Sequence, residues 1–115
     1  MSKLVAIYNQ PVETNAFDEA YFKSHRPLIA KVPGLQQTII TRFPRTLVGD
    51  DVYLMAEMYF SDSDALKDAL RSPQMAAAGE NLNSFARDKY TLAIGVEDTA
   101  STNPPQGSMM SSQAE

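Results

Sequence analysis

Two different spacings of apolar residues along the chain, one typical of strands and one typical of helices, divide residues 3–97 into segments. Strands are indicated by runs rich in β-branched and aromatic residues, at 3–9, 35–43, 52–60 and 90–96. Apolar residues three or four positions apart predict a helix over 14–31 and a second helical region over 62–85. The predicted order is therefore β-α-β-β-α-β.

Capping and turn residues mark the ends of the predicted helices. Thr14 or Asn15 can cap the first helix, and Val32-Pro33-Gly34 ends it, because proline cannot continue a helix and glycine tolerates the turn. Ser72-Pro73 predicts a fresh start within the second region, with serine as the cap and proline at the first helical position. Residues 44–51 are predicted to form a loop.

This element order is the split βαβ arrangement of an α+β, ferredoxin-like domain, in which two helices cover one face of a four-stranded antiparallel sheet. In the third strand the residues assigned to the helix-covered face are Val52, Leu54, Ala56, Met58 and Phe60. Those assigned to the uncovered face are Tyr53, Met55, Glu57 and Tyr59. An uncovered face this apolar is typical of an interface. It predicts a homodimer in which two sheets pack face to face, as in dimeric α+β barrels. The alternative is that the C-terminal tail covers the face.

The composition predicts one domain at 1–97 and a tail at 98–115. An apolar fraction of 43% with 21% charged residues is ordinary for a globular domain. The tail, DTASTNPPQGSMMSSQAE, is polar and of low complexity, so it has too little apolar surface to order itself.

Several classes of function are excluded by composition. A net charge of −4 argues against nucleic-acid binding, and no stretch of about 20 apolar residues predicts a membrane span. The absence of cysteine excludes disulfides and thiol nucleophiles, and a single histidine without cysteine gives no usual metal site. There is no glycine-rich phosphate loop, and no cofactor is expected. The N-terminal segment lacks the pattern of a signal peptide, so a cytoplasmic location is expected.

A resemblance to a known family rests on residues 17–28, FDEAYFKSHRPL, followed by VPGL at 32–35. A tyrosine, three residues, His-x-Pro-Leu and then Pro-Gly-Leu resemble the motif of the EthD family, and the likeness extends over about residues 3–97. The resemblance implies a ferredoxin-like chain associated with ethyl tert-butyl ether degradation. Relatives in the wider superfamily include cofactor-free lactone isomerases, decarboxylating enzymes and monooxygenases. The lactone methylisomerases carry a cysteine that this chain does not have.

Tyr21 and His25 are the candidate catalytic residues. Four positions apart on one helix, their Cβ atoms are expected about 5–6 Å apart on one face. Histidine titrates near neutral pH and suits a general base or acid, while a phenol can donate a hydrogen bond to a carbonyl oxygen. Pro27 cannot bond the Lys23 carbonyl, so a kink and a cavity are expected beside His25. The alternative is that His25 is a core residue whose nitrogens are satisfied by the backbone or by a hydroxyl.

Glu57, Arg42 and Tyr53 are the candidate substrate-binding residues. Glu57 lies in the middle of a strand, and a carboxylate buried there must be paired or neutral. Arg42 can pair with Glu57 across the sheet or across the dimer, and this pairing can equally be structural.

Three functions stay open. The first is a cofactor-independent enzyme of the isomerase, cyclase or decarboxylase type, acting on a small carbonyl or lactone compound through His25. The second is a non-catalytic accessory or ligand-binding module of a degradation or biosynthetic pathway. The third is a heme- or oxygen-dependent monooxygenase, with His25 as the axial ligand of any heme.

Overall fold

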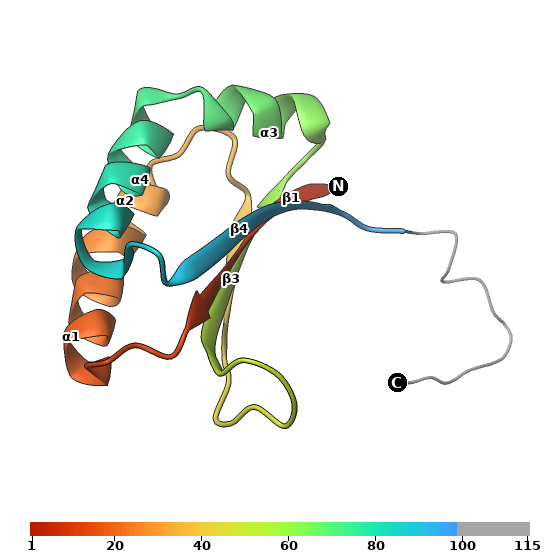
Figure 1. The fold of residues 1–115 in the computed structure, drawn as a ribbon. Coiled ribbons are helices and arrows are strands. Elements are labelled where there is room, and N and C mark those ends of the chain that lie inside the picture. Colours follow the sequence, from red (N-terminus) through yellow and green to blue (C-terminus); the bar gives the residue numbers. More distant parts are fainter. Residues whose placement is uncertain (99–115) are drawn as a thin grey trace, which may run out of the picture.

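The computed structural model describes residues 1–98 and has the predicted order of elements (Figure 1). The strands are β1 (Ser2–Asn9), β2 (Gln37–Arg42), β3 (Val52–Phe60) and β4 (Tyr90–Val96). The helical segments are α1 (Thr14–Glu19), η1 (Ala20–His25), α2 (Arg26–Ile29), α3 (Ser63–Leu70) and α4 (Pro73–Ala86). Residues 99–115, which make up nearly all of the predicted tail, lie outside the described residues.

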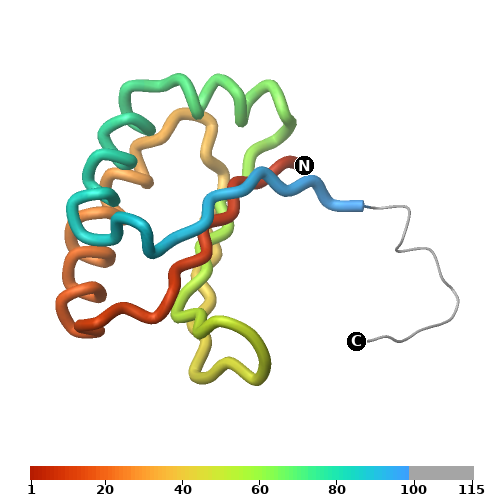
Figure 2. Tube along the Cα trace, viewed as in Figure 1, coloured from red at the N-terminus to blue at the C-terminus, as the bar shows by residue number. Residues whose placement is uncertain are grey.

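The strands form one antiparallel sheet in the order β2-β3-β1-β4, and the helices lie on one face of it (Figure 1). The first and last strands of the domain are direct neighbours, as the red and blue segments in Figure 2 show. Tyr8 of β1 is paired with Leu54 of β3 on one side and with Tyr90 of β4 on the other. The α+β, ferredoxin-like prediction is confirmed.

The hydrophobic core lies between the sheet and the helices. On β1 and β3, buried residues alternate with half-buried ones, as expected for strands with one face against helices. The strand residues of the core are Leu4, Ala6, Tyr8, Leu54, Ala56, Met58 and Phe60. Full burial of a side chain such as Leu54 or Phe60, both 0% exposed, contributes about 1.5–3 kcal/mol to folding.

Helix starts follow the predicted pattern in α4 but not in α1. The Ser72 hydroxyl accepts a hydrogen bond from the Met75 N–H at 3.1 Å and donates one to the Ala69 carbonyl at 2.7 Å, so the predicted cap is confirmed. The prediction that Thr14 or Asn15 caps the first helix is wrong. Thr14 is already the first helical residue, and Glu13 before it makes no side-chain capping bond.

The first helical region contains a π-helical segment at the position of the expected kink. In η1 the Arg26 N–H bonds the Tyr21 carbonyl, five residues back, instead of the residue four back. Pro27, which has no N–H and crowds the carbonyl four residues earlier, lies in the first turn of α2 directly afterwards. The wider turn accommodates this missing bond, so the kink takes the form of a π-turn.

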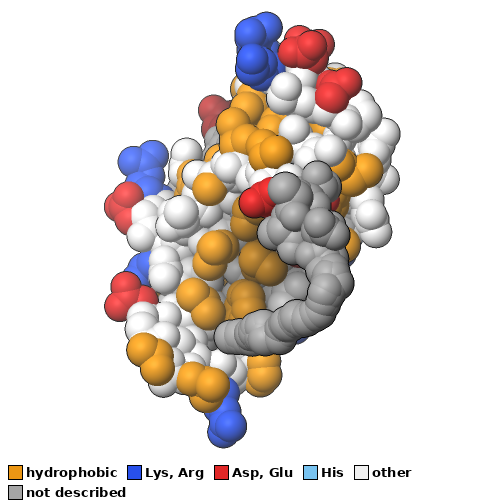
Figure 3. Space-filling view, turned by 90° about the vertical axis from the view of Figure 1, so that its right-hand side faces the viewer, with side chains coloured by type: hydrophobic (Ala, Val, Ile, Leu, Met, Phe, Trp, Pro, Cys, Tyr) orange, Lys and Arg blue, Asp and Glu red, His pale blue; other side chains and the backbone are white. Residues whose placement is uncertain are grey.

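The uncovered face of the sheet is apolar at its centre. It carries half-buried Val5 and Ile7 of β1 and Met55 of β3, and Ile7 pairs with Met55 across the two strands. Figure 3 shows hydrophobic side chains gathered over the middle of this side of the molecule, with charged groups mainly at the margins.

On the edge strand β4, side chains on the helix-facing side are largely exposed. Leu92, Ile94 and Val96 share the side of the sheet that the helices cover, yet they are 48%, 59% and 72% exposed. β4 is one of the two edge strands of the sheet, and the helices do not cover the far end of this row of side chains.

Candidate functional site

His25 lies at the end of η1 and points into the protein between the helices. It is 3% exposed, and its Nδ1 is 3.2 Å from Oδ1 of Asn81 on α4. Its ring centroid is 5.5 Å from that of Tyr21 and 6.1 Å from that of Phe85. The predicted proximity of Tyr21 and His25 is confirmed.

The surroundings of His25 favour a neutral imidazole. Burial lowers the pKa of His25, and the hydrogen bond with Asn81 opposes part of this shift. With the amide oxygen of Asn81 facing the ring, Nδ1 carries the proton and donates it. Nε2 then holds a lone pair, and it has no hydrogen-bond partner among residues 1–98. The imidazole is thus poised to accept a proton.

A cavity of about 60 Å³ lies beside His25, as predicted. We call it the inner cavity. Its lining, drawn from β1, β3, β4, α2 and α4 as well as His25, comprises Leu4, Ala6, Tyr8, His25, Ile29, Met58, Met75, Ala78, Gly79, Leu82, Tyr90 and Leu92. The space is enough for a few waters or a small organic group. Since nearly all of the lining is apolar, it favours an apolar group.

Tyr21 contacts His25 but does not line the inner cavity. It is 2% exposed, and burial raises the pKa of Tyr21 to about 12 despite opposing effects of Arg26 and of a hydrogen bond with Tyr8. Tyr8 does line the cavity, and its ring centroid is 5.3 Å from that of Tyr21. Burial also raises the pKa of Tyr8, so both phenols keep their protons.

Sequence reasoning missed both Tyr8 and Asn81. Tyr8 follows Leu4 and Ala6 on the buried side of β1, so the alternating pattern marked it only as part of the core. Asn81 lies four residues before Phe85 on α4, which places a polar group on a helix face that touches His25. This four-residue spacing is the sequence pattern that could have identified Asn81.

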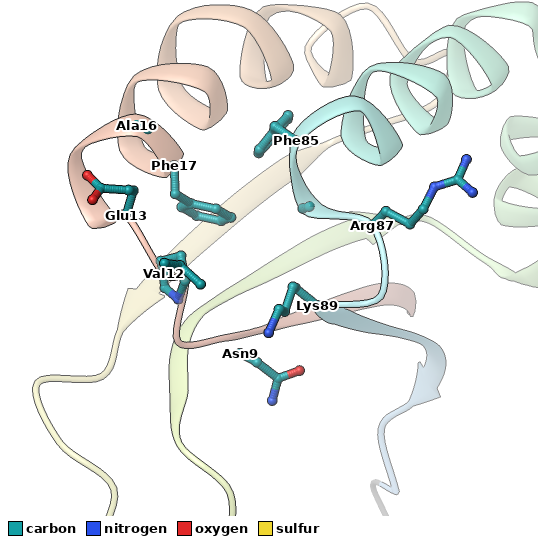
Figure 4. A pocket seen from close by; sticks show the side chains of 10 residues that line it. Asn9, Val12, Glu13, Ala16, Phe17, Phe85, Arg87 and Lys89 are labelled. Atoms are coloured by element: carbon teal, nitrogen blue, oxygen red, sulfur yellow. The ribbon is translucent and has the colours of Figure 1, made fainter.

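A larger hollow, the outer pocket, opens where α1 and the end of α4 meet the loops beside them (Figure 4). Its volume is about 360 Å³, within the range of small-molecule sites. Its lining residues are Asn9, Pro11, Val12, Glu13, Ala16, Phe17, Phe85, Ala86, Arg87 and Lys89.

Within one chain, the predicted pairing of Arg42 with Glu57 across the sheet is wrong. Arg42 is 3.5 Å from Asp18 on α1, and Glu57 is 2.8 Å from Lys3 on β1. Arg42 pairs with Leu54 in the sheet register, so it belongs to the helix-covered face, while Glu57 lies on the uncovered face. The hydrogen bond with Glu57 raises the pKa of Lys3.

Tyr53 also lies on the opposite side from the one predicted. Its hydroxyl donates to Asp18 at 2.8 Å, and its ring packs edge-on against Phe17 of α1. An irregularity in the β1–β3 register explains the change, because Tyr8 pairs with Leu54 and the next residue pairs with Val52. Tyr53 is therefore the extra residue of a β-bulge, which breaks the alternation of sides. None of Arg42, Tyr53 and Glu57 lines the inner cavity.

Within residues 1–98, no cluster of three or more His, Asp and Glu side chains is placed to hold a metal ion. In the same residues, no helix is long and apolar enough to cross a membrane.

Comparison with known proteins agrees with this fold. A crystal structure of an ethyl tert-butyl ether degradation (EthD) family protein from Bacillus halodurans superimposes with a TM-score of 0.80 at 42% identity, covering 85% of this chain and 99% of that one. An uncharacterized 11.0 kDa protein of the thcB-thcC intergenic region of Rhodococcus erythropolis is 28% identical over 101 residues, covering 86% of this chain and 97% of that protein. A ferredoxin-like protein of unknown function from Thermobifida fusca, described as dimeric, shares the fold with a TM-score of 0.63 at 12% identity, covering 84% of this chain and 90% of that one.

The family model of the EthD domain matches residues 9–89, which include the π-turn, His25 and the whole of α4. This match spans well over half of the chain and agrees with the resemblance at residues 17–35. The chain belongs to the EthD family.

Proposed function

We propose that this protein is a cofactor-independent enzyme in which His25 is the general base for a small carbonyl or lactone compound. One observation carries the proposal: a buried imidazole is held through Nδ1 by Asn81, while Nε2 is without a partner beside an apolar cavity. Burial lowers the pKa of His25, so the ring is in the proton-accepting form at neutral pH.

The reaction is a proton transfer through an enolate. Nε2 of His25 takes a proton from the carbon next to the carbonyl group, and the electron pair moves to the carbonyl oxygen. Tyr8 lines the same cavity, and its hydroxyl, which hydrogen-bonds with Tyr21, would turn to donate a hydrogen bond to that oxygen. Tyr21 acts as a positioning residue through its contacts with the His25 ring and with Tyr8. The imidazolium then returns the proton to a different carbon.

The isomerisation of α-angelica lactone to β-angelica lactone tests this chemistry. A proton leaves ring carbon 3 and one returns at ring carbon 5, so the double bond moves into conjugation and the product is followed by ultraviolet absorbance. The protein is expected to accelerate the reaction over buffer, and His25→Gln to reduce the rate about 10²–10⁴-fold. Lys67→Gln, on the exposed side of α3, is the matched control and should match the wild type. An unchanged rate in His25→Gln contradicts the proposal.

A non-catalytic ligand-binding module is the second candidate, and the apolar lining of the inner cavity favours it. The same lactone separates the two functions. Binding without isomerisation, detected as a shift of the His25 proton resonances, supports the module and contradicts the enzyme. Since the chain contains one histidine, these resonances have a single source.

We also propose that the protein is a homodimer through the uncovered face of the sheet. The apolar centre of that face, with Val5, Ile7 and Met55, supports this arrangement. The structural relative from Thermobifida fusca, described as dimeric, is consistent with it. Within each chain the ion pair of Lys3 and Glu57 neutralises the charges on this face, which reduces the cost of covering it.

A further inference from the structure

The outer pocket and the inner cavity are separated by one layer of aromatic rings. Phe85 lines the outer pocket, and its ring centroid is 6.1 Å from that of His25, which lines the inner cavity. Phe17 lines the outer pocket as well, and its ring is 5.5 Å from that of Tyr8. A ligand in the outer pocket therefore lies one ring away from the candidate base.

Phe85 is the more easily displaced ring of this layer. Phe17 is 5% exposed and packs against four aromatic rings, those of Tyr8, Tyr21, Tyr53 and Phe85. Phe85 is half-buried, and within residues 1–98 its ring contacts are those with Phe17 and His25. Rotation of the Phe85 side chain disrupts fewer ring contacts than rotation of Phe17 would. It connects the outer pocket with the inner cavity.

The positively charged side chain of Lys89 lies at the opening of the outer pocket. Figure 4 shows the ammonium of Lys89 directed towards Asn9 across the opening, whereas the carboxylate of Glu13 and the guanidinium of Arg87 lie at its outer edges. Among residues 1–98, Lys89 has no ion-pair partner. Its positive charge is thus available to a ligand.

The backbone holds Lys89 in this place. Its N–H donates to the Ala86 carbonyl at 3.0 Å, and its carbonyl accepts from the Asn9 N–H at 2.8 Å. Asp88 has a φ of 65°, the left-handed conformation that the third position of a type II turn requires and that aspartate tolerates better than most residues. The turn at the end of α4 therefore presents Lys89 from a fixed backbone.

We propose that the outer pocket binds small, flat organic acids, with the carboxylate on Lys89 and Asn9 and the apolar body directed past Phe85 towards His25. The inference rests on the proposed function only in taking His25 as the group that the apolar end approaches. A carboxylate matches the unpaired ammonium, and the aromatic floor of Phe17 and Phe85 matches a flat ring system. The substrate class is then a carboxylic acid whose reactive carbonyl lies at the end remote from the carboxylate.

Binding of 2-naphthoate, compared with the neutral 2-naphthalenemethanol, tests this proposal on the full chain. The acid is expected to bind more tightly than the alcohol and to shift the proton resonances of His25. Lys89→Ala should weaken binding of the acid about two- to fivefold, the effect of losing one exposed charge pair, and leave binding of the alcohol unchanged. Lys67→Ala removes an exposed lysine on α3 and should alter neither affinity.

Three results overturn the proposal: equal affinity for acid and alcohol, an unchanged affinity for the acid in Lys89→Ala, or binding that leaves the His25 resonances where they were. Phe85→Ala, which opens the way between the two spaces, should enlarge the shift of the His25 resonances, and a smaller shift counts against the route. The lactone reaction measures proton transfer and not binding of the acid, so either proposal can fail while the other stands.

Discussion

The charge state of His25 is the most direct test of the site, because the chain has one histidine and its imidazole resonances are read without overlap from another. Burial lowers the pKa of His25 below its ordinary value of 6.5, and the hydrogen bond with Asn81 opposes this in part. We expect a proton NMR titration of the folded protein to place the midpoint below 6.5.

The same shift makes stability depend on pH. The unfolded chain binds a proton at His25 with the ordinary pKa of 6.5, whereas the folded chain binds it at a lower pKa. The contribution of His25 to the free energy of unfolding is therefore complete above pH 6.5. It is lost as the pH falls from 6.5 to the pKa of His25 in the folded chain. One proton changes the free energy of unfolding by at most about 1.4 kcal/mol per pH unit within that window.

Urea unfolding of the wild type and of His25→Gln at a series of pH values isolates this contribution. Carboxylates contribute to acid sensitivity in both proteins, so the difference between the two curves reports His25. We expect the wild type to lose stability relative to the variant below pH 6.5. Asn81→Asp, which places a negative charge beside Nδ1, should raise the pKa of His25. A midpoint at or above 6.5 in the wild type would refute the argument that burial controls this imidazole.

Two further predictions concern assembly and folding. Wild-type protein should sediment at twice the 12.7 kDa chain mass. Met55→Lys on the uncovered face should yield a monomer, while the control Leu47→Lys, at a site 81% exposed, should leave the dimer intact. A wild-type monomer at micromolar concentration contradicts the interface. Ser72→Ala removes the cap of α4 and should lower the free energy of unfolding by about 0.5–2 kcal/mol in chemical denaturation, whereas exposed Ser61→Ala should leave it nearly unchanged.

The sequence predicted the fold well because the two apolar periods are strong and the turn signals agree with them. Gly34, at a φ of 81°, follows the first helical region as the Val32-Pro33-Gly34 pattern indicated. Tyr53 was misplaced because a bulge is a local change in register that alternation does not reveal. Arg42 was misplaced with it, since the expected partner lies on the other face of the sheet.

The candidate site was predicted less completely than the fold. The proximity of Tyr21 and His25 was predicted because their spacing of four is visible in the sequence, and the cavity was expected from the effect of Pro27. Asn81 escaped because it is 56 residues from His25 along the chain, and a contact across that separation is set by how the helices pack. The alternating pattern identified Tyr8 as a core residue, but no local pattern shows that part of its surface borders a cavity.

The π-turn connects these observations. A regular helix of 3.6 residues per turn places Ser24 within the apolar arc and His25 at its edge. In the structure Ser24 is exposed and His25 is 3% exposed. A turn widened by one residue rotates the side chains within it, so the buried position passes from Ser24 to His25. Pro27, by removing a backbone donor, favours the wider turn, and the wider turn brings the imidazole against Asn81 and the inner cavity. The proline of the family motif thus acts on the chemistry of His25 through the backbone, two residues away from it.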